Sequence, residues 1–394
     1  MKRFLIALMC VAVVFCYVPT MAFADQDVPA VQEQSETFAD SEETEQNTAP
    51  TPQAGTEEVR GGLSLTAPAA AQHIYVSGSG SDESGDGSEA NSYATLAKAA
   101  EVVNQDTDPG NAFTIHVVSD LTAKECARFY NHAVTIVGEG EPTPTVSRGE
   151  GFAPQQDTAR GTYNPAMIEI QTANAPASLT LSNIILDDGG LHVGTVFAQA
   201  VSQGENGGDA PNNSTYVQDA IIASNATQAC TITLGAGTVL RNYGGMSAVR
   251  VTNQAVLKME AGSAMEDTTT DRTKGSAEGE VGPAGAVWAQ GGTLLMEAGA
   301  EIRSMVGRAI YADGGSITIG GKIHNIKGDA DMWQGTKGVA LHLRNGAVGS
   351  IQQNAVISDL DTGESAIAVL ACNLNVEKNT VIKNLKNMIG IADS

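Results

Sequence analysis

Apolar and polar residues alternate in short runs through the second half of the chain, and these runs recur in a fixed order. Six segments with the same pattern start at Gly237, Gly262, Gly299, Gly320, Asn354 and Asn379, with spacings of 25, 37, 21, 34 and 25 residues. A short unit with occasional insertions is typical of a solenoid, in which each repeat stacks on its neighbours. No helical segment recurs within the unit, so leucine-rich and ankyrin arrays are not supported.

Each repeat holds three short segments that alternate with period two, which predicts strands with one buried face. The first carries apolar pairs such as Ile232 and Leu234, and the second centres on single apolar residues such as Leu240. The third falls at residues 248–251, 286–289, 309–312, 340–343 and 366–369. Three strands per coil, stacked at about 4.8 Å, predict an all-β fold, a right-handed parallel β-helix solenoid, over residues 72–394.

A polar residue follows the second strand of each repeat. These residues are Asn242, Asp267, Ser304, Asn325, Asp359 and Asn384, and Asp188 is predicted as an earlier member. Asn and Asp tolerate the left-handed backbone conformation, and their side chains hydrogen-bond to nearby backbone. We therefore expect a structural ladder along one corner of the solenoid.

The first 24 residues have the pattern of a secretory signal peptide. Lys2 and Arg3 precede an apolar stretch that ends at Val18, and Ala22-Phe23-Ala24 supplies a cleavage site. Nothing later approaches the roughly 18 apolar residues of a membrane-spanning helix. The protein is therefore expected to be secreted, to reside at the cell surface or in the cell wall, and to have no transmembrane anchor in this chain.

Residues 25–71 are rich in Glu, Asp, Gln, Thr, Ala and Pro, which predicts a disordered acidic linker. The whole chain has a formal net charge of -23. Such an acidic protein is not expected to bind nucleic acid or an anionic membrane surface.

Three cysteines follow the signal peptide, Cys126, Cys230 and Cys372, and their wide spacing does not predict a zinc site. Whether any two of them pair is left open.

Residues 73–101 contain a strand, a loop rich in Gly, Ser and Asp, and the segment Thr95-Leu96-Ala97-Lys98-Ala99, where a helix is predicted over about 95–104. This order resembles the N-terminal edge of pectate-lyase-like (pectin-lyase-like) β-helix proteins, although Tyr93-Ala94 stands where that family usually has Pro. The resemblance implies that the helix caps the solenoid core. It also implies a family in which many members cleave acidic polysaccharides. The last repeat ends without a capping element, so the C-terminus is expected to be uncapped or truncated.

Alignment of the third strands places Arg250, Trp288, Tyr311, His342 and Ala368 on the outer face of consecutive coils. Aromatic rings flanked by Arg and His suit stacking on sugar rings. Insertions at residues 268–283 and 328–337 leave the same corner and could form the walls of a groove, with Trp333 on one wall. Alternatively, the insertions lie over the Trp288 and Tyr311 rings and bury them. The candidate ligand-binding residues are Arg250, Trp288, Tyr311, His342 and Trp333.

Acidic residues give weaker signals for a metal. Glu260, Glu297 and Glu377 occupy matching positions, and a solvated edge or a bridging Ca²⁺ would explain them. The segment 82–87 begins like a calcium loop, but Tyr93 stands where the bidentate Glu belongs. No cofactor and no metal site are therefore predicted, and Ca²⁺ is kept as an alternative.

No catalytic set can be assembled. Asp187-Asp188 alone matches the elements of polygalacturonase-like relatives, and Arg250 has no accompanying acid in the outer row. The main hypothesis is adhesion or carbohydrate binding without evident catalysis, with polysaccharides, or glycans or proteins of a host or neighbouring surface, as partners. One alternative is a polysaccharide lyase or glycoside hydrolase of the same fold. The other is a passive surface stalk.

Overall fold

The computed structural model describes residues 71–153, 155–157, 162–164, 166–189, 220–243, 247–266, 285–328, 338–361, 366–385 and 390–392. All of them belong to the unit Leu65–Ser394. The predicted signal peptide, nearly all of the acidic linker, nearly all of the two long insertions, and Trp333 lie outside the described residues.

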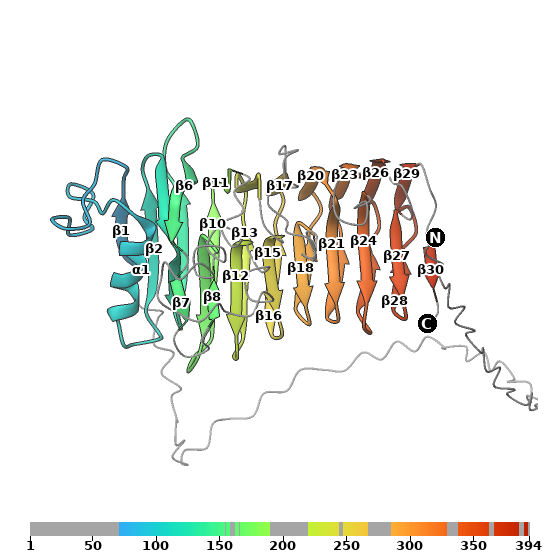
Figure 1. Cartoon of the computed structure of the whole chain (residues 1–394), viewed down its shortest axis with the longest axis horizontal. Coiled ribbons are helices and arrows are strands. Elements are labelled where there is room, and N and C mark those ends of the chain that lie inside the picture. Colours follow the sequence, from blue (N-terminus) through green and yellow to red (C-terminus); the bar gives the residue numbers. More distant parts are fainter. Residues whose placement is uncertain are drawn as a thin grey trace, which may run out of the picture. The chain divides into compact units, whose positions relative to one another are not determined.

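Three parallel sheets run along the stack, and each coil contributes one strand to each sheet (Figure 1). Sheet 1 contains β1 (Gln72–Val76), β2 (Ala112–Val117), β5 (Ala133–Gly138), β10 (Ala177–Ser182), β13 (Cys230–Leu234), β16 (Ala255–Met259), β19 (Thr293–Met296), β22 (Ser316–Ile319), β25 (Val348–Ile351) and β28 (Asn373–Val376). Sheet 2 contains β3 (Leu121–Glu125), β6 (Thr145–Ala153), β11 (Ile185–Asp187), β14 (Val239–Arg241), β17 (Ala264–Glu266), β20 (Glu301–Val306), β23 (Lys322–Lys327), β26 (Val356–Asp361) and β29 (Val381–Leu385).

Sheet 3 contains β4 (Ala127–Tyr130), β9 (Ile168–Thr172), β12 (Ala220–Ala226), β15 (Ser247–Thr252), β18 (Val287–Gln290), β21 (Arg308–Asp313), β24 (Val339–Arg344), β27 (Ile367–Leu370) and β30 (Gly390–Ala392). A separate antiparallel pair is formed by β7 (Gln155–Asp157) and β8 (Thr162–Asn164). The predicted right-handed parallel β-helix with three strands per coil is confirmed.

Apolar side chains form rows through the interior of the coil stack. On sheet 1, Leu179, Ile232, Leu257, Leu294 and Ile317 stand opposite one another on successive strands, and none is more than 1% exposed. Burial of such a side chain contributes about 1.5–3 kcal/mol relative to leaving it in water. The period-two alternation in the sequence therefore maps onto one continuous core with polar residues outside.

The predicted polar ladder lies at a corner where the chain bends, after β14 and within β20, β23, β26 and β29. Its members have left-handed backbone with φ of 53–57° at Asn242, Ser304, Asn325, Asp359 and Asn384. Asn325 donates from Nδ2 to Ser304 Oγ at 3.0 Å, and Asn384 donates from Nδ2 to Asp359 Oδ1 at 2.6 Å. The left-handed conformation is confirmed at these five positions, and ladder bonds join Ser304 to Asn325 and Asp359 to Asn384. Asp267 lies outside the described residues.

Asp188 departs from the predicted ladder. Its side chain is buried and forms an ion pair with Arg148, whose own side chain is only 1% exposed. The amide of Asn242 instead donates to Asp187 Oδ1 at 3.0 Å. The Asp188 carboxylate therefore pairs with the buried Arg148 guanidinium, because an unpaired buried cation would cost several kcal/mol.

The helix predicted over 95–104 is α1 (Leu96–Gln105). Thr95 is its N-cap and accepts the Lys98 N–H at 3.1 Å. Its buried face consists of Leu96, Ala99, Ala100 and Val103, and it packs mainly on β4 at the end of the stack (Figure 1). Its position confirms the predicted capping role, because it covers apolar side chains of the first coils.

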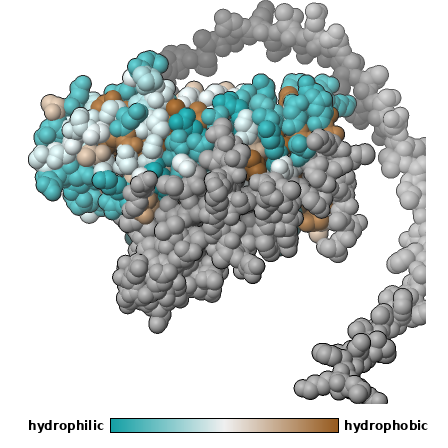
Figure 2. Space-filling view, turned by 45° about the horizontal axis from the view of Figure 1, so that its top comes forward, coloured by the Kyte–Doolittle hydropathy of each residue, from teal (hydrophilic) through white to brown (hydrophobic). Residues whose placement is uncertain are grey.

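The described surface in Figure 2 is mainly hydrophilic, with scattered hydrophobic residues. The large apolar side chains that are exposed are Val118, Leu295, Val348, Val376 and Val381, at 38–49%. Within the described residues no helix has the length and hydropathy needed to cross a membrane.

Candidate ligand-binding face

The predicted outer row of sheet 3 is present, and its members stand opposite one another in register. The row runs through Arg250, Trp288, Tyr311, His342 and Ala368 on β15, β18, β21, β24 and β27. It also extends in the other direction through Ala223, Glu169 and Arg128. Four of the five candidate binding residues thus share one face, and Trp333 lies outside the described residues.

The side chains in this row are less accessible than an open stacking platform would be. Trp288 is only 9% exposed, while Arg250, Tyr311 and His342 are half-buried. The Trp288 side chain is therefore largely covered, while nearly all of the insertions considered as its cover lie outside the described residues.

Two ring nitrogens in this row have no hydrogen-bond partner in the described structure. They are Trp288 Nε1, which can only donate, and His342 Nε2. A buried polar atom without a partner costs about 1–3 kcal/mol, so native proteins rarely keep one without reason. The two atoms lie on either side of Tyr311 in the row. Both nitrogens are enclosed by protein, so hydroxyl or carbonyl groups of a ligand reach them only when neighbouring side chains move aside.

Tyr311 is held by its neighbours on the same sheet. Arg344 donates from Nη1 to the Tyr311 hydroxyl at 2.9 Å, and the Arg308 guanidinium lies 5.3 Å from the ring centroid. The His342 ring meets Tyr311 edge-on, with centroids 5.1 Å apart. Arg344 also approaches Asp313 at 3.6 Å. Sequence alignment of the outer row missed these arginines because they lie at the ends of their strands.

His342 is neutral at physiological pH in this setting. Burial, together with the positive charges of Arg308 and Arg344, lowers the pKa of His342 to about 4. Burial likewise lowers the pKa of Arg308. A neutral imidazole carries one N–H donor and one acceptor nitrogen, so His342 can exchange hydrogen bonds with a hydroxyl without carrying charge.

The row begins with a buried ion pair that the sequence analysis did not find. Arg128 Nε donates to Glu169 Oε2 at 2.6 Å, and the side chains are only 11% and 2% exposed. Burial by itself would lower the pKa of Arg128, but the Glu169 carboxylate outweighs this effect and raises it. The pair neutralises itself at this end of the row.

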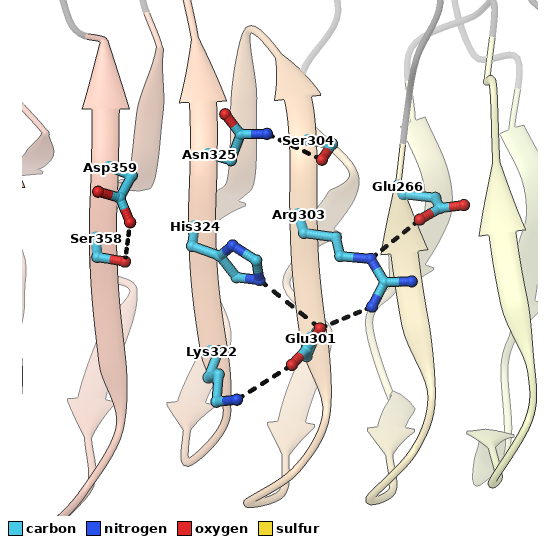
Figure 3. A network of polar contacts seen from close by, with 9 residues as sticks. All are labelled: Glu266, Glu301, Arg303, Ser304, Lys322, His324, Asn325, Ser358 and Asp359. Carbon is cyan, nitrogen blue, oxygen red and sulfur yellow. Dashed lines mark hydrogen bonds and ion pairs between the residues drawn. The ribbon is translucent and has the colours of Figure 1, made fainter.

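The outer face of sheet 2 is a network of charged side chains (Figure 3). Arg303 donates to Glu266 at 3.0 Å and to Glu301 at 2.7 Å. Lys322 and His324 approach Glu301 from the next strand, at 3.3 and 3.7 Å. The hydrogen bond from Arg303 is the main reason that the pKa of Glu301 is lowered. This face therefore satisfies its own charges.

The acidic residues considered as calcium ligands form ion pairs or hydrogen bonds with other groups of the protein. Lys258 Nζ lies 2.8 Å from Glu260 and 3.1 Å from Glu297, and Glu377 accepts the Gln353 N–H at 3.1 Å. Asp82 accepts hydrogen bonds from Thr95 and the Ala94 N–H at the start of α1. Within the described residues no group of three or more His, Cys, Asp or Glu side chains is arranged around a metal position.

The Asp187-Asp188 pair, considered for hydrolysis, is also engaged. Asp187 accepts from Arg241 Nε at 2.6 Å, and Asp188 pairs with the buried Arg148. Both carboxylates therefore already serve as partners of cations at one corner of the coil.

The three cysteines are unpaired thiols. Cys126 and Cys230 are buried, and burial raises the pKa of Cys230 to about 12 and that of Cys126 still further. Such thiols behave as small apolar side chains.

A second polar cluster, on the outer face of sheet 1, was missed from the sequence. His73 on β1 and His116 on β2 share a hydrogen bond of 2.8 Å, and His116 also bonds to Glu139. Tyr75 stacks on the His116 ring with centroids 4.5 Å apart. The signal was present, because His73 and His116 alternate with buried apolar residues, but the first coils were not aligned with the repeats.

The chain was compared with protein-family models, with curated proteins and with solved structures. None of the three comparisons found a match. The assignment to a right-handed parallel β-helix therefore stands on the three parallel sheets and their strand register.

Proposed function

We propose that this protein is a secreted or cell-surface β-helix of the pectate-lyase-like type that binds carbohydrate through the outer face of sheet 3. The observation that carries the proposal is the pair of buried, unpartnered nitrogens at Trp288 and His342, on either side of Tyr311. Polar atoms of this kind fix the orientation of a ligand in an otherwise apolar site.

The mode of binding follows from the burial of the row. Trp288 has a buried indole N–H without a partner among the described residues, and the half-buried Tyr311 lies beside the Arg308 and Arg344 guanidinium groups. Sugars combine apolar ring faces with many hydroxyl groups, so they match a row of alternating aromatic and polar side chains. A polysaccharide, or a glycan or glycoprotein on a host or neighbouring surface, is the partner that fits this chemistry.

The test is a glycan-panel binding screen with the full chain and three variants. Trp288→Phe removes the indole N–H but keeps an apolar ring, and Tyr311→Phe removes only the hydroxyl. Tyr75→Phe makes the same change on sheet 1, so it is the matched control. We expect Trp288→Phe to weaken binding about tenfold or more, because it removes one hydrogen bond worth about 1.4 kcal/mol in a buried site. Tyr75→Phe should leave binding unchanged.

Product formation is followed on the same polysaccharides. New reducing or unsaturated ends would overturn the non-catalytic reading and support a lyase or hydrolase. If no glycan binds, or if Trp288→Phe and Tyr75→Phe bind as the unaltered chain does, the proposed face is wrong. A passive stalk would then be the better description.

A further inference from the structure

Three side chains on the outer face of sheet 1 form a continuous hydrogen-bonded chain. Glu139 Oε1 bonds to His116 Nδ1, and His116 Nε2 lies 2.8 Å from His73 Nδ1. The side chain of His116 is 12% exposed, that of Glu139 is 44% exposed, and His73 is exposed to solvent. The cluster lies on a different sheet from the proposed carbohydrate-binding face.

The order of donors and acceptors follows from the carboxylate. An ionised Glu139 can only accept, so His116 Nδ1 must carry the hydrogen that is donated to it. In a neutral His116 ring, Nε2 then holds a lone pair that points at His73 Nδ1. His73 in turn donates from Nδ1, although its other tautomer would present a lone pair at the same place.

We propose that His73 and His116 bind a divalent transition-metal ion such as Zn²⁺ or Cu²⁺, with Glu139 as the positioning residue. Two nitrogens that each lie about 2.05 Å from a tetrahedral zinc ion are about 3.3 Å apart. The present 2.8 Å separation needs to open by about 0.5 Å to accept the ion. The ring centroids lie 5.1 Å apart, so the two nitrogens face each other along one line. To bind one ion, His73 shifts its hydrogen to Nε2 and each ring turns by about 35°, so that the two lone pairs converge at the tetrahedral angle.

The surroundings of His116 match those of a metal-binding histidine. Such a residue usually donates its second ring N–H to a carboxylate, which fixes the tautomer and strengthens the ligand. Glu139 takes that place here, and Tyr75 stacks on the ring with planes 14° apart. Strands β1 and β2 are paired in register, so the two histidines are held by sheet backbone and not by a loop.

The ligand set also decides which ions fit. Imidazole nitrogen favours zinc, copper and nickel, whereas Ca²⁺ and Mg²⁺ require oxygen ligands. The protein supplies two ligands, of which His73 is exposed to solvent and His116 is largely buried, so water completes the coordination from the His73 side. The site is therefore expected to exchange its ion readily and to select against calcium.

The test uses the full chain without an added histidine tag and measures Zn²⁺ binding by calorimetry and by competition with a chromogenic chelator. One ion per chain is expected from the His73–His116 pair. His73→Ala should weaken that binding at least tenfold, and Glu139→Gln should weaken it about 10- to 100-fold while both ligands stay in place. His324→Ala, on sheet 2, is the matched control and should bind as the unaltered chain does.

Cu²⁺ gives a second readout that does not depend on affinity. Its electron paramagnetic resonance spectrum should show coupling to two nitrogens in the unaltered chain and in His324→Ala, and fewer in His73→Gln. His73 is exposed, so both of its variants are expected to fold, and circular dichroism verifies this. Absence of binding at millimolar Zn²⁺, or equal binding by His73→Ala and the unaltered chain, would overturn the site. Equal binding by Glu139→Gln would overturn the role of Glu139.

Discussion

The outer faces of sheets 2 and 3 belong to the same coils, yet they differ in whether their polar side chains have hydrogen-bond or ion-pair partners. On sheet 2, Arg303 bridges Glu266 and Glu301, and the charged groups are about a quarter to a third exposed. On sheet 3, Trp288 and His342 keep buried nitrogens that have no partner in the part of the chain that the structure describes. The same coils therefore carry one face whose charged groups pair with each other and one row with unpaired buried nitrogens, and we propose the second as the binding face.

The largest expected difference between the two faces concerns their ion pairs. Glu169→Ala leaves the buried Arg128 charge without its partner, which should lower the free energy of unfolding by about 3–5 kcal/mol. Glu266→Ala makes the same change beside the partly exposed Arg303, which keeps Glu301, and should cost no more than about 1 kcal/mol. Urea unfolding of both variants measures the contrast. Equal losses would mean that burial does not distinguish the two faces.

A smaller effect should follow from the titration of His342. Its pKa of about 4 in the folded chain lies below the ordinary value of 6.5, so the unfolded chain binds the proton more tightly. The stability that the neutral His342 contributes is therefore fully present above about pH 6.5 and is lost as the pH falls from 6.5 toward 4. We expect this loss in the free energy of unfolding to be about 1–2 kcal/mol, a value reduced to allow for the partial exposure of the ring.

The matched variant for this effect is His342→Gln, which keeps a polar side chain but does not titrate. Both proteins share every other acid-sensitive group, so the difference between their stabilities at pH 7 and pH 4.5 isolates His342. A difference that does not change with pH would show that the ring is more solvated in the folded chain than its burial indicates.

The corner that joins the two faces should respond more weakly. Asn325 has φ of 57°, and an Ala at that conformation costs about 1 kcal/mol, because its Cβ crowds the following carbonyl. Asn325→Gly avoids this strain and should be nearly neutral, since Gly adopts positive φ readily. Thermal unfolding of the pair separates backbone strain from the lost bond to Ser304. If both variants lose the same stability, the side-chain bond and not the backbone is what holds the corner.

The strand pattern could be predicted because each coil repeats the same local rule. Period-two alternation located the third strands, and Thr95 with the following apolar residues located α1. The register of the outer row followed from the same alignment, so Trp288, Tyr311 and His342 were placed together correctly. Local periodicity is enough for this, since every strand meets only its two neighbours in the stack.

Burial and partner choice were beyond that rule. Alternation shows that Trp288 points outward, but not that it is 9% exposed. The Arg148–Asp188 and Glu139–His116 contacts join residues 40 and 23 positions apart, and charge alone does not select such partners. The His73–His116 pair lay in the first coils, where the repeat was not recognised.

The smallest expected effect sharpens the comparison from the exposed side. Lys322→Met removes an amine that lies 3.3 Å from Glu301 and is 53% exposed, while Arg303 still bonds to the same carboxylate. The loss should be a few tenths of a kcal/mol at low salt. It should vanish near 1 M NaCl, where the screening length falls to about 3 Å. Glu169→Ala should keep most of its effect at that salt concentration, because its ion pair is buried. Parallel unfolding curves at 0.05 and 1 M NaCl therefore distinguish the exposed ion pairs of sheet 2 from the buried ion pair of sheet 3.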